Sequence, residues 1–188
     1  VTNIMLEGDR PPSAGGTTYT YTVHPFESYE LALNFNMGSS LSWKLLGESE
    51  ATGTGTGRLF QNGETFSVTN GTSGKDALGA AAITNGNVTV MTAMRDFAVN
   101  QPKAIAVSGS RLTYELFPKS AAGTPYALDP ASRKNSRFCI AFKTGGLSQG
   151  DLADLSQKVN APMRILAPQY WYQATGAWTR GFGVPQGT

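Results

Sequence analysis

The chain has 188 residues, of which 40% are apolar and 15% are charged, with a formal net charge of +2. A chain of this length can bury one substantial core, and so few charges exclude disorder caused by charge repulsion. The small net charge gives no support for nucleic acid or an anionic membrane as a partner. The longest apolar runs, such as residues 80–83, fall far short of the ~18 residues of a membrane span. We therefore expect one soluble domain without a membrane or nucleic-acid role.

The chain has a single cysteine, Cys139, and a single histidine, His24. One cysteine excludes an intrachain disulfide, and the same counts exclude metal sites built from His/Cys clusters. Cys139 lies in the apolar run 138–142, which predicts a small buried side chain. His24 precedes Pro25 at the end of an expected strand and is interpreted as structural or solvent-facing. No Gly-x-Ser-x-Gly motif accompanies it, so Ser/His catalysis is not expected. We predict no metal and no cofactor.

The first half of the chain alternates between apolar and polar residues. Residues 1–16 contain Pro11-Pro12 and Gly15-Gly16, which are typical of an N-terminal linker or extension. The ranges 17–23, 29–35 and 41–45 then place aromatic or aliphatic residues at every second position, the pattern of half-buried strands. Residues 51–57 read Ala-Thr-Gly-Thr-Gly-Thr-Gly. No Gly-Lys-Ser/Thr follows, so a flexible loop or an edge strand is favoured over a phosphate-binding loop.

The middle of the chain continues this pattern with explicit turns. Asn-Gly dipeptides at 62–63, 70–71 and 85–86 are typical of hairpin turns. Many short strands separated by turn residues indicate a sandwich or a barrel. We predict an all-β fold, an antiparallel β-sandwich over residues 17–179. Its further strands are expected at 58–61, 64–69, 77–83, 87–95, 104–108, 111–117 and 137–143.

One short helix is expected near the C-terminal end. The run Ser148-Gln149-Gly150-Asp151 resembles a capping sequence, and Leu152, Leu155 and Val159 follow at helical spacing. Pro162 should end the helix. A short strand at 163–166 and an aromatic group follow, and the Gly-rich residues 180–188 are interpreted as an exit linker.

The alternation also predicts which side chains share the core. Residues two apart on a strand point to the same face. The predicted core residues are Tyr29, Leu31, Leu33, Phe35, Val88, Val90, Leu112, Tyr114, Leu116, Phe138, Ile140 and Phe142. Residues 95–103 are predicted to form a structural corner, because Pro102 fixes φ and disfavours helix at Gln101. Asp96 is placed there to accept hydrogen bonds from backbone N–H groups or a guanidinium.

Three segments of the chain resemble a known family. The first is Met94-Arg95-Asp96-Phe97, then Gln101-Pro102-Lys103-Ala104 and the strand 112–118; the second is 137–144, ending Ala141-Phe142-Lys143-Thr144; the third and weaker is 162–178. Together they resemble the central region of the exo-rhamnogalacturonan lyase-like proteins, often called the PcRGLX/YetA-like family. The resemblance implies a β-sandwich that lies, in that family, between an N-terminal barrel and a C-terminal α/α toroid.

The chain departs from the family pattern at two positions. Ala98 stands where the family usually has Trp, and Gly145 stands where it has His. A lyase that removes the C5 proton of a uronic acid needs a base and a group that neutralises the carboxylate. The cations Arg95, Arg137 and Lys143 are suited to neutralisation. No strong base remains beyond tyrosines or His24, so we expect no catalytic residue in this chain.

These residues define the expected function. The chain is interpreted as a non-catalytic β-sandwich domain of a secreted polysaccharide-lyase-like protein that supports or extends a glycan cleft. The alternatives are an independent carbohydrate-binding module, a structural or adhesive extracellular domain of a filament or fibre, and a complete small lyase. Expected partners are an acidic polysaccharide or a neighbouring helical toroid domain, and the expected location is secreted or periplasmic.

Aromatic residues near the C-terminal end complete the predicted substrate-binding set. Flat rings stack on the apolar faces of sugars, but the same rings can also dock on their own domain. The predicted substrate-binding residues are Arg95, Arg137, Lys143, Tyr170, Trp171, Tyr172 and Trp178.

Overall fold

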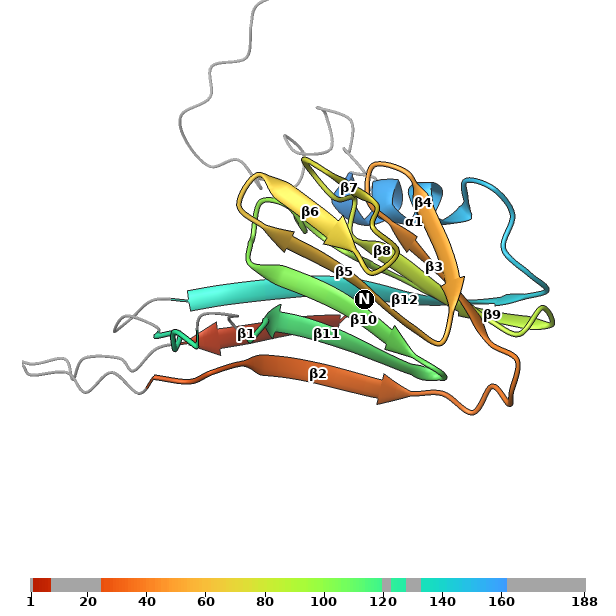
Figure 1. The fold of residues 1–188 in the computed structure, drawn as a ribbon, viewed down its shortest axis with the longest axis horizontal. Coiled ribbons are helices and arrows are strands. Elements are labelled where there is room, and N and C mark those ends of the chain that lie inside the picture. Colours follow the sequence, from red (N-terminus) through yellow and green to blue (C-terminus); the bar gives the residue numbers. More distant parts are fainter. Residues whose placement is uncertain (1, 8–24, 120–122, 128–132, 162–188) are drawn as a thin grey trace, which may run out of the picture.

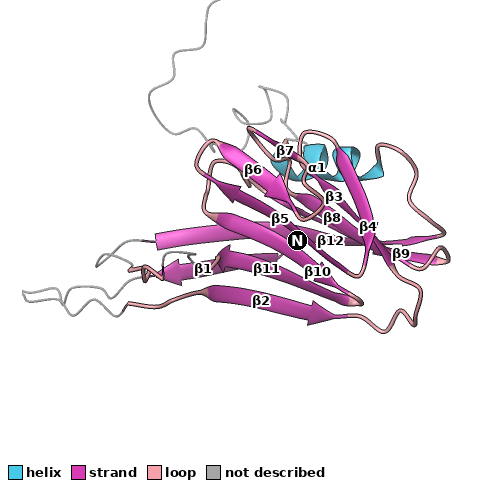
Figure 2. Cartoon of the chain, viewed as in Figure 1, coloured by secondary structure: helices cyan, strands magenta, loops and turns pink. Residues whose placement is uncertain are grey.

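The computed structural model describes residues 2–7, 25–119, 123–127 and 133–161, and it confirms the expected antiparallel β-sandwich. Two six-stranded sheets face each other, and the described part contains a single short helix (Figures 1 and 2). The elements in chain order are β1 Thr2–Glu7, β2 Tyr29–Asn34, β3 Ser42–Leu46, β4 Glu50–Thr54, β5 Thr56–Asn62, β6 Thr65–Val68, β7 Ser73–Gly74, β8 Ala80–Thr84, β9 Val88–Met94, β10 Lys103–Ser108, β11 Arg111–Phe117, β12 Arg133–Thr144 and α1 Asp151–Asn160.

Each sheet joins strands that are far apart in the sequence. The first sheet has the order β1-β12-β9-β8-β3-β4, and the second has the order β2-β11-β10-β5-β6-β7. The chain passes from the first sheet to the second at Gly55, whose φ of 72° suits glycine. It passes again at the corner between β9 and β10, where residues 95–100 form turns. This corner carries Arg95 and Asp96, two of the residues that sequence analysis singled out.

The core between the sheets follows the predicted alternation, with three exceptions. Five of the twelve predicted core residues are buried, namely Val90, Leu112, Tyr114, Leu116 and Phe138. Leu31, Leu33, Phe35 and Ile140 are half-buried and pack against this core. The prediction was wrong for Tyr29, Val88 and Phe142, whose exposed fractions are 42%, 41% and 69%. Val88 and Tyr29 each begin a strand, and Phe142 lies near the end of β12, so all three lie at strand ends rather than in the middle of the sandwich.

A second, smaller apolar cluster lies on the outer face of the first sheet, under α1. Leu152 of the helix is fully buried against the small side chains of Ala80, Ala82 and Ala93. Alanines on this face let the helix approach the sheet closely, and α1 covers β8 and β9 (Figure 2). The helix begins after Gly150, which has a φ of 88° and makes no side-chain cap, so the predicted capping run does not cap in the usual way.

The Thr-Gly repeat spans the edge strand β4 and the start of β5. Residues 51–54 belong to β4, and Gly57 belongs to β5 of the other sheet. The buried indole of Trp43 lies against both Gly53 and Gly57. A Cβ atom at Gly57 would come within 2.6 Å of the ring. The glycines are therefore needed for packing, which composition alone did not reveal.

Part of the expected N-terminal linker belongs to the sandwich. Within residues 1–16, strand β1 pairs with β12 over Thr2–Glu7. The linker interpretation depended on the prolines and glycines further along, and it overlooked the apolar run that precedes them. The predicted strands 17–23 and 163–166 and the exit linker 180–188 lie outside the described residues.

Candidate functional site

Two of the predicted cations meet at one end of the first sheet. Arg95 follows β9 directly, Arg137 lies in β12, and the N–H of Arg95 donates to the carbonyl of Arg137 at 2.8 Å. Residues directly opposite each other in an antiparallel ladder project from the same face. Both guanidinium groups therefore leave the outer face of the sheet, and they line a pocket of about 250 Å³.

The rest of this pocket is polar. Its lining is completed by Asp96, Asn100 and Asn135. We call these five residues the arginine pocket. The lining offers two guanidinium groups and one carboxylate, and its two amides can donate or accept hydrogen bonds. The arrangement suits an anion that also carries hydroxyl groups.

The corner that carries Arg95 is fixed by the helix. Asp96 adopts a φ of 51°, unusual for a residue other than glycine, and its N–H donates to the side-chain oxygen of Asn160 at 2.8 Å. Asn100 closes the turn by donating its N–H to the carbonyl of Asp96 at 3.0 Å. The Asp96 carboxylate lies 3.4 Å from Nε of Arg95 as an ion pair, but that Nε makes no hydrogen bond among the described residues, so the predicted hydrogen bond from a guanidinium is not seen there. Residues 95–100 thus form turns within the expected corner at 95–103, whose last residue, Lys103, already belongs to β10.

Beneath the corner lies a buried lysine that sequence analysis did not single out. Lys103 begins β10 and is fully buried, and its Nζ has no hydrogen-bonding partner among the described residues. Its pKa is lowered to about 8, chiefly by burial and also by the charge of Lys134, while Asp96 opposes the shift. Alternation with the buried Ile105 and Val107 was the sequence signal that could have placed it inside.

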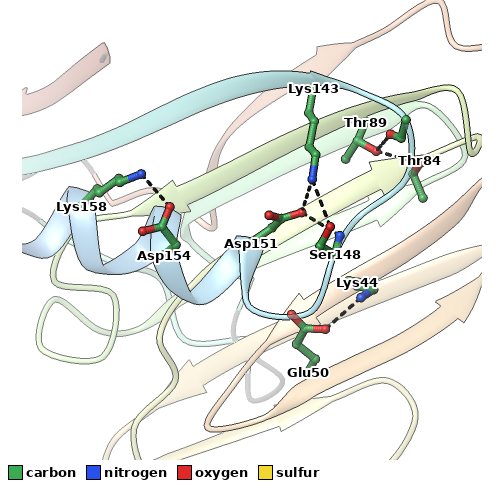
Figure 3. Close-up of polar contacts among 10 residues, drawn as sticks. Lys44, Glu50, Thr84, Thr89, Lys143, Ser148, Asp151, Asp154 and Lys158 are labelled. Carbon is green, nitrogen blue, oxygen red and sulfur yellow. Dashed lines mark hydrogen bonds and ion pairs between the residues drawn. The ribbon is translucent and has the colours of Figure 1, made fainter.

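Lys143, the third predicted cation, lies at a different place. It is six residues further along β12 than Arg137, which separates the two by roughly 20 Å. Its Nζ lies 2.7 Å from the Asp151 carboxylate, at the start of α1 (Figure 3). Hydrogen bonds from Lys143 and from the Ser148 N–H hold the pKa of Asp151 below its usual value. The structure does not bring Lys143 to the arginine pocket.

A second hollow of about 330 Å³ lies beside this ion pair. Its lining combines Trp43 and Leu147 with several hydroxyl-bearing residues and Lys44, whose amine lies 2.9 Å from Glu50 (Figure 3). The hydroxyl-bearing residues are Ser42, Thr52, Thr54 and Thr84. Its lining contains no guanidinium group, so it lacks the two parallel donors that the arginine pocket can offer to a carboxylate.

The remaining predicted site residues fall outside the described part of the chain. These residues are Tyr170, Trp171, Tyr172 and Trp178. His24 also lies outside the described residues.

Cys139 is half-buried rather than buried, because it projects from the outer face of β12. Within the described ranges, no three His, Cys, Asp or Glu side chains gather as a metal site would require. No described helix is both long and apolar enough to cross a membrane.

Comparison with protein-family models, with curated proteins and with solved structures finds no match to this chain.

Proposed function

We propose that this chain is a non-catalytic β-sandwich domain of a secreted polysaccharide-lyase-like protein, and that its arginine pocket binds a carboxylate of an acidic glycan. The observation that carries the proposal is the placement of Arg95 and Arg137 side by side on one pocket. Both residues come from the two segments that resemble the exo-rhamnogalacturonan lyase-like proteins.

The chemistry of the pocket supports an acidic sugar rather than a bare anion. A guanidinium can bind a carboxylate through two parallel hydrogen bonds. The amides of Asn100 and Asn135 lie on the same pocket and are suited to sugar hydroxyls. A uronic acid unit combines both groups, which makes a uronate-containing polymer the favoured ligand class.

The non-catalytic part of the proposal comes from the sequence. Gly145 stands where the resembling family has histidine, and in the structure Gly145 lies at the far end of β12 from the arginine pocket, where its N–H donates to Asn87. Proton abstraction from a uronate requires a base near the substrate. A supporting or binding role needs only the arginine pocket.

Calorimetric titration with galacturonate oligomers tests this function, with neutral galactose oligomers of equal length as the comparison. We expect measurable binding of the acidic oligomers only, weakened by added salt. Arg95→Gln should weaken it by ~10–100-fold, because hydrogen bonds between charged groups are worth about 1.5–3 kcal/mol.

The matched control is Arg111→Gln. Arg111 is an exposed arginine of β11 in the other sheet and lies 3.7 Å from Glu30. This variant should bind as the parent chain does. Equal binding of acidic and neutral oligomers, or equal loss in both variants, would refute the pocket as the binding site.

An independent carbohydrate-binding module would give the same titration result. The two roles differ in their partners: a supporting domain should bind more tightly when its neighbouring helical domain is present. A structural or adhesive domain would bind neither oligomer.

A further inference from the structure

The last turns of α1 are tied to two segments that lie apart in the sequence. Ser156 is buried, and its hydroxyl donates to the carbonyl of Leu78, just before β8, at 2.8 Å. Four residues later, the side-chain oxygen of Asn160 accepts the N–H of Asp96, at the β9–β10 corner, also at 2.8 Å. One turn of helix therefore connects the arginine pocket to the other side of the first sheet's outer cluster.

The helix itself orients the amide of Asn160. The NH2 group of this amide donates to the carbonyl of Ser156 at 2.9 Å and to the hydroxyl of the same residue at 3.3 Å. An asparagine side chain offers an NH2 group as donor and a carbonyl oxygen as acceptor. Because the NH2 group is directed to Ser156, the oxygen is left to face the corner. The helix thus presents a fixed acceptor to the N–H of Asp96.

Asp96 has a backbone conformation that needs such support. Its φ of 51° is uncommon for a residue other than glycine. Conformations of this kind persist only where the surroundings over-determine them, and they concentrate at binding and active sites. The N–H of Asp96 is bound by Asn160, and its carbonyl accepts the N–H of Asn100. Asp96 and Asn100 both line the arginine pocket, so their placement depends on the contact with α1.

The corner also packs against the segment before β8 that Ser156 holds. The ring of Phe97 is buried and occupies the space where a side chain at Gly79 would lie. The N–H of Met94 donates to the carbonyl of Gly79 at 2.9 Å. The helix, the corner and the segment before β8 therefore form one closed set of contacts.

The two arginines of the pocket are held differently. The N–H of Arg95 donates to the carbonyl of Arg137 within the β9–β12 pairing. The sheet therefore places the main chains of both arginines, whereas the helix places Asp96 and Asn100. The guanidinium groups suit a carboxylate, while the side chains of Asp96 and Asn100 can bind hydroxyl groups.

We infer that Asn160 is a positioning residue of the arginine pocket: by holding Asp96 and Asn100 in place, it sets a preference for carboxylates that carry neighbouring hydroxyl groups. This inference rests on the proposed binding of an acidic glycan. Asn160 is not among the residues that line the pocket, so it acts through the N–H of Asp96. A chain without this contact keeps both arginines and should still bind carboxylates, but it should no longer distinguish a uronate from a carboxylate without hydroxyl groups.

Calorimetric titration with two oligomers of equal charge tests this role. One is a galacturonate oligomer, and the other is a glutamate oligomer, whose side chains carry no hydroxyl groups. The parent chain should bind galacturonate more tightly. Asn160→Ala should weaken galacturonate binding by roughly 3–10-fold, the effect of one lost hydrogen bond, and leave glutamate binding unchanged.

Ser156→Ala is the matched control. The main-chain carbonyl of Ser156 remains in this variant and still orients the Asn160 amide, so the preference for galacturonate should stay. Ser156→Ala removes a buried hydroxyl and its hydrogen bond to Leu78, and urea unfolding should find it less stable than Asn160→Ala. If Asn160 were merely structural, the preference would follow stability, and Ser156→Ala would lose it as well; that result would overturn the inference.

NMR of the ligand-free chain gives a readout that does not depend on a glycan. The coupling between the N–H and Hα protons of Asp96 reports its φ, and it should change in Asn160→Ala but not in Ser156→Ala. An unchanged coupling in Asn160→Ala, or a preference for galacturonate that survives in it, would overturn the inference. A parent chain that binds neither oligomer would refute the proposed function instead, and the coupling would still decide whether Asn160 holds the corner.

Discussion

The amine of Lys103 lies between the two sheets without a hydrogen-bonding partner among the described residues. A charged group in such a place destabilises the folded state, because burial removes its water. The pKa of about 8, against an ordinary 10.5, expresses this cost. The difference corresponds to about 3 kcal/mol at pH values where the amine is charged in both states.

We predict that stability rises with pH between about 8 and 10.5. In that range the unfolded chain keeps the proton on Lys103 while the folded chain has lost it, so the unfolded state binds more protons and folding gains with pH. Lys103→Met should stabilise the fold by up to about 3 kcal/mol at neutral pH, with a smaller gain above the folded pKa. Urea unfolding at several pH values measures both; a Lys103→Met gain that does not change with pH would contradict the assignment.

At the scale of the elements, Trp43 joins the two sheets through glycines. Its indole is buried against Gly53 of β4, its neighbour in the first sheet, and against Gly57 of β5 in the second. Hydrophobic periodicity predicted the strand that carries Trp43 but not this contact. The contact depends on which residues face each other across the sandwich, and a single sequence does not state that.

Gly57→Ala should destabilise the protein by about 1–3 kcal/mol, because the added methyl group overlaps a ring that cannot move away. This cost exceeds the ~0.4–1 kcal/mol that a Gly→Ala change usually gains by restricting the unfolded chain. Gly146→Ala is the control: its Cβ would meet only the carbonyl oxygen of Gly86, at an ordinary contact distance of 4.0 Å, and its φ is not left-handed. Chemical denaturation of both variants compares them; a Gly57→Ala protein as stable as the control would show that the indole has room.

At the scale of the whole molecule, the sequence predicted the layers better than their edges. Period-two spacing placed Leu112, Tyr114 and Phe138 inside correctly, because central strands are covered on both sides. The same spacing failed at Phe142, which lies near the end of β12 and is exposed. The short strand β1 was missed because the prolines and glycines that follow it dominated the interpretation.

For the candidate site, the sequence predicted which cations matter but not which of them lie together. Arg95 and Arg137 were both singled out, and the β9–β12 register brings them together. Lys143 was grouped with them because it lies in the same sequence segment as Arg137. Along a strand, six residues separate side chains too far to share a pocket. Register, which sequence patterns alone did not supply, decides which of the cations meet.

We predict no polysaccharide lyase turnover by this chain. The arginine pocket can neutralise a uronate, but general-base catalysis contributes roughly 10²–10⁴ in rate and needs a positioned base. The absorbance of unsaturated uronide products, followed with rhamnogalacturonan or another uronate polymer, measures it. A steady rise that disappears in His24→Ala would contradict the non-catalytic proposal while leaving the binding proposal standing.

The most direct test of the central claim is an NMR titration of the isotope-labelled chain with a galacturonate oligomer. The account predicts that the side-chain Nε resonance of Arg95 and the backbone amides of Asp96 and Asn100 shift together and saturate at one affinity. Resonances around Lys44 and Lys143, at the other end of the helix, should stay in place. Shifts confined to that second region, or none anywhere at saturating oligomer, would contradict the arginine pocket as a glycan site.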